Sequence, residues 1–346
     1  MLQGAASTAP LKTLCILGAG SWGTALAIAL SGRFETISLW VHNAGNASVM
    51  KATRQNERYL PGFTIPPNVR ISADGELCLA EAEFVISVVP SAFFRSTMSK
   101  LRCRIPPSAK FVSATKGIEE GSLLRMSAVA RDVLEWDDDR AISVISGPTF
   151  AREVAERQPA AMVVASEDLA FAEDVQRALA TPDLRFYATP DVVGVETGAA
   201  LKNVVAIGAG ICHGLGLGSN SVAALITRGL AEITRLAVRL GGNAQTLSGL
   251  AGLGDLVLTA TGDLSRNRSV GIQLGRGERL DSILAGMNMV AEGVGTCAAA
   301  FELSRRLDMD LPIINKMHEI LFEGKEPRMA LRELMDRPLK IEAVRL

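Results

Sequence analysis

A glycine-rich turn lies between two apolar runs close to the N-terminus of the chain. Gly18, Gly20 and Gly23 form the turn. The apolar run Leu14–Leu17 before it has the pattern of a buried strand, and Thr24–Leu30 after it favours a helix. In such a turn the first glycine allows the tight bend, the second lets a ligand approach the backbone, and the third lets the helix pack on the strand. Because the helix N-terminus also offers free N–H groups to phosphates, the pattern predicts a dinucleotide site.

The length and charge of the chain exclude several classes of protein. Its 346 residues favour two domains over one. The 36 basic residues balance the 37 acidic ones without a basic arm, so we expect no nucleic-acid partner. Met1–Pro10 lacks a secretory pattern, and no apolar run of about 20 residues predicts membrane insertion. Five scattered cysteines without CxxC pairs indicate a reduced, cytoplasmic setting and no metal site.

The first half of the chain alternates short β-rich runs with helical patterns. This alternation predicts an α/β fold with a doubly wound, mostly parallel sheet that helices cover on both faces. Ligands of such sheets bind beyond the carboxyl ends of the strands. The expected strands are Leu14–Leu17, Thr36–Trp40, Asn68–Ser72, Phe84–Val89, Phe111–Thr115, Ala141–Ser146, Ala161–Ala165 and Arg185–Tyr187.

The pattern changes near Pro190, after which small and apolar residues recur at helical spacing. Two long, largely buried helices are expected first, and shorter ones follow. We therefore expect a dinucleotide-binding domain at residues 1–190 and a helical substrate domain at residues 191–346. The expected helices are Asp191–Leu217, Asn220–Leu240, Arg268–Gly275, Val294–Leu307, Ile313–Phe322 and Arg328–Met335.

Two lysines are candidates for the proton transfer that accompanies hydride transfer to a carbonyl. None of the three histidines lies in a catalytic setting, and burial can lower the pKa of a lysine toward neutrality. Lys116 follows a predicted strand at the edge where α/β sheets hold their active sites, although a solvated loop lysine gives the same pattern. Lys202 lies inside a long apolar helix, where it must snorkel, pair with an acid or serve chemistry.

A polar cluster opens one of the shorter predicted helices. Its run Ser265–Arg268 suits a phosphate or carboxylate, but the run alone favours a helix cap with solvated arginines. Asp255 lies among glycines and leucines, where it caps a helix or pairs with a buried lysine. Asn203, next to Lys202, orients either that lysine or a substrate hydroxyl.

Together these motifs resemble those of NAD(P)-dependent sn-glycerol-3-phosphate dehydrogenase of the soluble bacterial type. The resemblance spans nearly all of the chain. It implies a Rossmann-like domain followed by an all-helical domain of the 6-phosphogluconate dehydrogenase type. It also implies the reversible reduction of dihydroxyacetone phosphate to sn-glycerol 3-phosphate, which supplies glycerophospholipid synthesis. The motifs are Gly18–Ala25, Val89–Ser91, Ala114–Gly117, Ile145–Ala151, Leu201–Val204, Gly252–Leu256 and Ser265–Arg268.

The resemblance also implies a role for each matching residue. Lys202 is implied to be the catalytic proton donor or acceptor, and Asp255 to position it. The implied substrate-binding residues are Lys116, Gly147, Thr149, Lys202, Asn203, Asp255, Ser265, Arg266 and Asn267. The implied cofactor-binding residues are Gly18, Gly20, Ser21, Trp22, Gly23, His42, Lys116, Ala151, Arg266, Val290 and Glu292.

The end of the second predicted strand bears on the choice of cofactor. NAD-selective sites carry an acid there, about 20 residues after the glycines, to bind the ribose hydroxyls. The run Trp40–Asn43 contains no acid, and His42 can donate to a 2′-phosphate. We therefore expect NADPH to be favoured, with NADH as the alternative.

Two other classes of protein share part of this pattern. A two-domain reductase of a hydroxy acid or a ketopantoate-like substrate also uses a lysine, but it has no need of the run Ser265–Arg268. A cofactor-sensing regulator without catalysis needs neither the buried lysine nor a phosphate site. For any of these classes a homodimer is expected from the general frequency of symmetric dimers.

Overall fold

The computed structural model describes residues 11–136, 141–287, 289–339 and 341. Met1–Pro10, the segment without a secretory pattern, lies outside the described residues. The chain divides into two compact units, of which the first comprises Met1–Thr115 and Met126–Val192. The second comprises Lys116–Arg125 and Val193–Leu346. The short segment Lys116–Arg125 thus packs with the second unit although the sequence on both sides of it belongs to the first.

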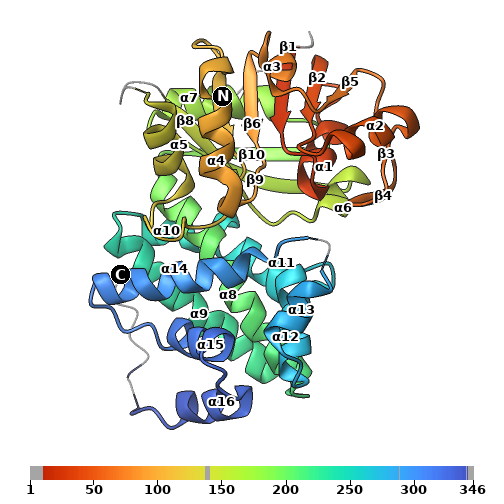
Figure 1. Ribbon diagram of the computed structural model, residues 1–346. Helices are drawn as coiled ribbons and strands as arrows, with labels where there is room; N and C mark the ends of the chain where they lie inside the picture. The colour runs from red at the N-terminus through yellow and green to blue at the C-terminus, as the bar shows by residue number, and fades with distance from the viewer. Residues whose placement is uncertain (1–10, 137–140, 288, 340, 342–346) are drawn as a thin grey trace. The chain divides into compact units, whose positions relative to one another are not determined.

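Within the described residues, the first unit contains one sheet of eight strands in the order β10-β9-β8-β7-β6-β1-β2-β5 (Figure 1). Neighbouring strands are parallel except β8 and β9, which are antiparallel. The direction of winding reverses between β1 and β6, so the prediction of a doubly wound, mostly parallel sheet is confirmed. The strands are β1 (Leu11–Leu17), β2 (Phe34–Trp40), β5 (Val69–Ser72), β6 (Phe84–Ser87), β7 (Lys110–Ser113), β8 (Ile142–Ser146), β9 (Ala160–Ala165) and β10 (Leu184–Thr189).

Helices cover both faces of this sheet, so consecutive residues of β1, which point to opposite faces, are all buried. Leu14, Cys15, Ile16 and Leu17 are each at most 1% exposed. The short antiparallel pair β3 (Gln55–Asn56) and β4 (Leu60–Thr64) was not predicted. The helical segments of this unit are α1 (Ser21–Ala29), α2 (Ala44–Thr53), α3 (Gly75–Leu79), α4 (Ser91–Leu101), η1 (Arg102–Arg104), α5 (Met126–Leu134), α6 (Ala151–Ala155) and α7 (Leu169–Leu179).

Apart from the loop Lys116–Arg125, the regular elements described in the second unit are all helical, as the sequence predicted. Two segments, η2 and the helix α11 that carries Asp255, were not predicted as helical, because the glycine-rich run of η2 resembles a loop. The segments are α8 (Val192–Gly214), α9 (Ser219–Arg239), α10 (Ala244–Leu247), η2 (Leu250–Gly254), α11 (Asp255–Thr261), α12 (Arg266–Gly275), α13 (Leu280–Ala285), α14 (Glu292–Arg306), α15 (Pro312–Phe322) and α16 (Pro327–Met335).

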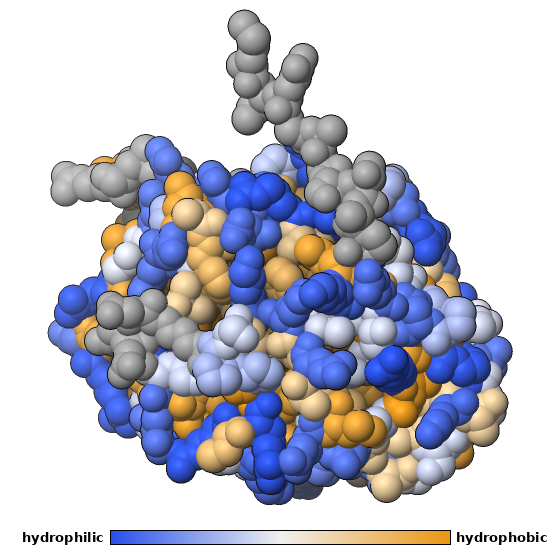
Figure 2. Space-filling view, turned by 90° about the horizontal axis from the view of Figure 1, so that it is seen from above, coloured by the Kyte–Doolittle hydropathy of each residue, from blue (hydrophilic) through white to orange (hydrophobic). Residues whose placement is uncertain are grey.

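Helix α8 is the core of the second unit. Every residue from Gly194 to Cys212 is buried. By length and composition α8 is the one helix among the described residues that could cross a membrane, but 94% of its most apolar window is buried inside the protein. The apolar character of α8 is therefore explained by its place in a protein core. On the outside of the molecule, polar side chains surround several separate apolar patches on the face shown in Figure 2.

Glycines let neighbouring segments approach α8 at backbone distance. A Cβ atom added to Gly271 of α12 would lie 1.9 Å from the carbonyl oxygen of Ile207. One added to Gly293 of α14 would lie 2.7 Å from the carbonyl oxygen of Asn203, and one at Gly198 of α8 would lie 2.8 Å from that of Ala251. Since real Cβ atoms do not approach so closely, these glycines fix how near η2, α12 and α14 lie to the helix.

Candidate active site

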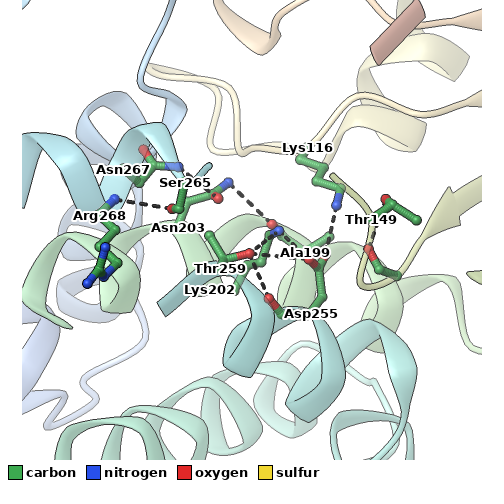
Figure 3. A network of polar contacts seen from close by, with 11 residues as sticks. Lys116, Thr149, Ala199, Lys202, Asn203, Asp255, Thr259, Ser265, Asn267 and Arg268 are labelled. Atoms are coloured by element: carbon green, nitrogen blue, oxygen red, sulfur yellow. Dashed lines mark hydrogen bonds and ion pairs between the residues drawn. The ribbon is translucent and has the colours of Figure 1, made fainter. Parts of the chain in front are cut away.

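A buried carboxylate joins two lysines in the second unit (Figure 3). Asp255 opens α11, and its Oδ1 atom forms an ion pair with the ammonium of Lys202 on α8. Its Oδ2 atom lies 2.7 Å from the Nζ atom of Lys116. Thr259, one turn further along α11, accepts a hydrogen bond of 2.7 Å from Lys202 and donates one of 2.7 Å to the backbone carbonyl of Asp255. The predicted pairing of Asp255 with a buried lysine is thus present in the structure.

Burial sets the protonation behaviour of this cluster. The side chain of Asp255 is 0% exposed, that of Lys202 7% and that of Lys116 16%. Burial lowers the pKa of Lys202 from its ordinary 10.5 to about 7; the charge of Asp255 opposes this shift and that of Lys116 adds to it. Burial alone would raise the pKa of Asp255, but the charges of Lys116 and Lys202 outweigh burial and hold the pKa below its ordinary value.

The geometry leaves Lys202 able to act on a further group. An ammonium has three N–H donors. Asp255 and Thr259 accept two of them, and the third finds no acceptor within the part of the chain that the structure describes. A lysine with a pKa of about 7 can give or take a proton near neutral pH, which is what reversible carbonyl reduction requires.

A chain of amide hydrogen bonds extends from the neighbour of Lys202. The side-chain amide of Asn267 on α12 donates to Oδ1 of Asn203 on α8 at 2.9 Å. The backbone N–H of Gly293 on α14 donates to Oδ1 of Asn267 at 3.0 Å. These bonds bring the starts of α12 and α14 to the part of α8 that carries the catalytic candidate.

The structure contains the helix cap that the cluster at the start of α12 suggested. Ser265 caps α12, because its Oγ atom accepts a hydrogen bond of 3.2 Å from the backbone N–H of Arg268. Arg268 also pairs with Asp263 at 2.9 Å. Arg266 is exposed, and its guanidinium donates to the carbonyl oxygen of Val290 at 3.1 Å. The cap therefore orders the helix start, while the exposed guanidinium of Arg266 remains accessible to an anion.

The glycine-rich turn of the first unit has the geometry that its sequence predicted. Gly18 has a φ of +115°, which side-chain-bearing residues rarely adopt. A Cβ atom added to Gly23 would lie 1.9 Å from the carbonyl oxygen of Gly18, so the third glycine is needed for packing of α1. At Gly20 an added Cβ atom would meet no described protein atom within 4 Å. The middle glycine thus faces open space, as a ligand-approach position requires.

A buried asparagine that the sequence analysis missed holds this turn. Asn56 is 2% exposed, and its side-chain amide donates to the carbonyl oxygen of Ala19 at 3.0 Å and to the hydroxyl of Thr24 at 2.8 Å. Its sequence neighbourhood carries no sign of this role, because the contact spans 32 to 37 residues. Thr259 was also missed, although its spacing of four residues from Asp255 is that of two neighbours on one helix face.

The remaining cofactor candidates of the first unit lie at helix starts and strand ends. Ser21 and Trp22 open α1, whose N-terminus has no side-chain cap. His42 is exposed just after β2, with its ring centroid 5.7 Å from that of Trp40. Asn43 caps α2 by accepting a hydrogen bond of 2.9 Å from the N–H of Asn46. The end of β2 therefore carries an exposed imidazole and no carboxylate.

The segment after β8 turns at a position that only glycine fits. Gly147 has a φ of +155°, and an added Cβ atom would lie 2.9 Å from the carbonyl oxygen of Ala161. The hydroxyl of Thr149 donates to the carbonyl oxygen of Gly147 at 3.3 Å, and Ala151 begins α6. These three residues belong to the first unit, with Gly18, Gly20, Ser21, Trp22, Gly23 and His42.

The second unit holds the other candidates, including Val290 and Glu292, which the resemblance assigned to the cofactor alone. Val290 is 43% exposed and accepts the bond from Arg266, and Glu292 opens α14. Among the described residues no group of three or more His, Cys, Asp or Glu side chains could hold a metal ion. The second unit thus contains Lys116, Lys202, Asn203, Asp255, Ser265, Arg266, Asn267, Val290 and Glu292.

The fold and the two clusters define a class of protein. A doubly wound unit with a dinucleotide-type glycine turn, and a helical unit with a buried lysine poised near neutral pKa, together indicate a nicotinamide-dependent dehydrogenase. The family is given by comparison with known proteins. The sequence models of the N-terminus and C-terminus of NAD-dependent glycerol-3-phosphate dehydrogenase match residues 13–172 and 191–332. The chain therefore belongs to the NAD-dependent glycerol-3-phosphate dehydrogenase family.

Individual relatives agree with this assignment. The chain is 48% identical to glycerol-3-phosphate dehydrogenase (NAD(P)+) of Geobacter sulfurreducens over 94% of this chain and 98% of the relative. It is 48% identical to that of Acidobacterium capsulatum over 95% and 99%. The crystal structure of glycerol-3-phosphate dehydrogenase from Coxiella burnetii has a TM-score of 0.90 at 37% identity and covers 94% of this chain and 99% of that one. The predicted family resemblance and fold class are thus confirmed.

The glycine turn gives a first test of the dinucleotide site. Gly20 has an extended backbone that alanine also adopts, so Gly20→Ala should leave stability unchanged but raise the Kd for NADH or NADPH about tenfold or more. Gly23→Ala should instead lower the free energy of unfolding by at least about 1–3 kcal/mol, because its methyl group meets backbone. Fluorescence titration and urea unfolding measure the two effects.

Gly32→Ala serves as the control for both variants, since its added Cβ atom also meets no described atom within 4 Å and the residue lies outside the turn. We expect it to change neither cofactor affinity nor stability. Unchanged cofactor binding by Gly20→Ala would show that the pyrophosphate does not bind at this turn.

Proposed function

We propose that this protein catalyses the reversible reduction of dihydroxyacetone phosphate to sn-glycerol 3-phosphate with a nicotinamide dinucleotide. The observation that carries the proposal is the buried Lys202–Asp255 pair beside Lys116. An arginine at a helix start in the same unit, Arg266, offers a site for a phosphate. The relatives named above carry glycerol-3-phosphate dehydrogenase in their names, which supports this substrate. The product is the backbone precursor of glycerophospholipids.

In this mechanism the bound dinucleotide supplies the hydride to the ketone carbon or accepts it from the alcohol carbon. Lys202 gives a proton to the oxygen that the hydride addition leaves negatively charged, and it takes that proton back in the reverse direction. Asp255 and Thr259 hold the ammonium, and the charge of Lys116 helps to stabilise the developing alkoxide. One ketone, one hydride and one proton together give the alcohol.

The substrate phosphate is proposed to bind at Ser265, Arg266 and Asn267. A dianionic phosphate held at the start of α12 would supply binding energy remote from the reacting carbon and fix the carbonyl near Lys202. Asn203 would orient the substrate through its amide, which already accepts from Asn267 at 2.9 Å. Gly147 and Thr149 are proposed to complete the substrate side, in line with the family resemblance.

NADPH is proposed as the preferred cofactor, with NADH as the alternative. The exposed imidazole of His42 supports this proposal. Asn43, the next residue, is not an acid, and its side chain already caps α2. The proposed cofactor contacts are the glycine turn, Lys116 and Arg266, together with Ser21, Trp22, His42, Ala151, Val290 and Glu292. A homodimer that works in the cytoplasm is also proposed; the five cysteines, all free, fit a reducing compartment.

The role of Lys202 is tested by Lys202→Met. We expect turnover to fall by about 10²-fold or more with little change in cofactor affinity, because the general acid is lost. In the wild-type protein, kcat/KM for ketone reduction should fall as pH rises through about 7, since the neutral amine has no proton to give. Alcohol oxidation should instead rise over the same range. Lys100→Met, which changes an exposed lysine of α4, is the control. Near-normal turnover of folded Lys202→Met would exclude this role.

The phosphate site is tested by Arg266→Ala. Loss of a charge-assisted contact to phosphate should lower kcat/KM for dihydroxyacetone phosphate. The corresponding loss of transition-state stabilisation should be about 2–4 kcal/mol. The loss should largely vanish for dihydroxyacetone, which has no phosphate. Arg276→Ala removes an exposed arginine from the other end of α12 and should affect neither substrate. An equal loss for both ketones would place Arg266 outside the phosphate site.

Cofactor choice is tested by His42→Asp. An acid at the end of β2 should repel a 2′-phosphate and accept a hydrogen bond from the ribose hydroxyl of NADH, so the NADPH-to-NADH ratio of kcat/KM should fall. High salt should reduce the effect at this exposed position. Ser48→Asp, which adds the same charge to an exposed position of α2, should change the ratio much less. An unchanged ratio in His42→Asp would assign the 2′ position to other residues.

A further inference from the structure

The segment Lys116–Arg125 has its own attachment to the helical unit. It closes into a loop, because Ile118 and Arg125 form an antiparallel bridge at its ends. Within it, the N–H of Glu119 donates to the carbonyl oxygen of Leu124 at 3.0 Å. Ile118 is 3% exposed and belongs to the apolar core around α8. The segment that begins with a candidate site lysine is therefore a structured loop of the second unit.

A partly buried ion pair fastens the far end of this loop to α8. The Nη1 atom of Arg125 lies 2.5 Å from the Oε2 atom of Glu196, and their side chains are 23% and 5% exposed. Glu196 lies six residues before Lys202 on α8, about 9 Å along the helix axis at 1.5 Å per residue. A carboxylate in so apolar a helix needs a cationic partner. Loss of that partner would leave a buried, unpaired charge and would strongly destabilise the attachment of the loop to α8.

The ion pair bears on the site through the bridge between Arg125 and Ile118. Only Gly117, with a φ of +148°, separates Ile118 from Lys116. The position of the Lys116 backbone therefore depends on the bridge, and the bridge depends on the end that Glu196 holds. Lys116 in turn lies 2.7 Å from Asp255, the carboxylate that it shares with Lys202.

We propose that Arg125 and Glu196 are positioning residues that hold Lys116 against Asp255 for the reduction of the substrate carbonyl. This inference rests on the proposed function. The two residues act through the loop Lys116–Arg125 and touch neither the substrate nor the cofactor. Their pairing keeps two positive charges on one carboxylate, an arrangement that mutual repulsion of the ammonium groups would otherwise loosen.

The arrangement has a signature that a purely structural ion pair does not have. The charged groups that bear on Lys202 are Asp255 from α11 and Lys116 from the loop, and the charge of Lys116 lowers the pKa of Lys202. If the loop loosens, Lys116 moves away from Asp255 and the pKa of Lys202 rises. The affinity for substrate should fall at the same time, because Lys116 no longer supports the carbonyl.

The test compares Arg125→Met and Glu196→Gln with Lys116→Met. For Arg125→Met and Glu196→Gln we expect the pKa of Lys202 to rise by about half a unit or more. It is measured by NMR of lysine labelled with ¹³C at the ε carbon, without substrate. We also expect a severalfold higher KM for dihydroxyacetone phosphate. Arg125→Lys should restore most of both values because it keeps the charge. Glu196→Gln keeps the volume of the buried side chain and provides a second variant should Arg125→Met fail to fold.

The decisive measurement is the double variant. In a Lys116→Met background, Arg125→Met should add no further change in the pKa of Lys202, because its effect passes through Lys116. Lys325→Met is the matched control. It removes a lysine, 27% exposed, that pairs with Glu319 and Glu333 in the same unit, and it should lower stability without moving the pKa of Lys202.

Two results would overturn the inference. One is an unchanged pKa of Lys202 in folded Arg125→Met or Glu196→Gln. The other is a full additional effect of Arg125→Met in the Lys116→Met background. The NMR measurement needs no substrate, so a failure of the inference is distinguishable from a failure of the proposed reaction. In the second case the wild-type protein would not reduce dihydroxyacetone phosphate.

Discussion

The second unit depends on one fully buried carboxylate. Asp255 is 0% exposed, and such a charge is tolerated only when it is paired and hydrogen-bonded. Its partners come from different parts of the chain, Lys202 from α8 and Lys116 from the loop after β7. The carboxylate thus ties three segments together, and removal of either lysine would leave a buried charge with less compensation. The same requirement for pairing that holds these segments together also assembles the groups that carry the proposed chemistry.

The sequence predicted the fold because its signals are local. The strands of the sheet are short apolar runs, and the glycine turn after β1 carries its geometry in three residues. The helical segment η2 could not be predicted in the same way, since its run Leu250–Gly254 is rich in glycine and resembles a loop. Helical structure there depends on contact with α8. A Cβ atom added to Gly198 of α8 would lie 2.8 Å from the carbonyl oxygen of Ala251, so glycine at this position allows the close approach. Tertiary packing decided what local propensity left open.

The candidate site was predictable where a residue contradicts its surroundings, as a lone lysine does in an apolar helix. Asn56 could not be found in this way, because a polar residue in a polar stretch gives no contrast and its partners lie 32 and 37 residues away. The membership of Lys116 in the helical unit was also hidden, since the strand before it belongs to the first unit. Long-range contacts of single side chains leave no periodic trace in a sequence.

The acid–base behaviour of Lys202 arises from opposing effects. Burial alone pushes the pKa down, Asp255 pushes it up, and Lys116 pushes it down again, with a result of about 7. An exposed lysine would remain protonated at neutral pH and could only donate, whereas a lysine buried without an acid would remain neutral and could only accept. The combination of a buried helix with one shared carboxylate therefore gives a group that works in both directions. The pH at which Lys202 changes from proton donor to proton acceptor is then a consequence of how α8 is buried and of which charges reach it.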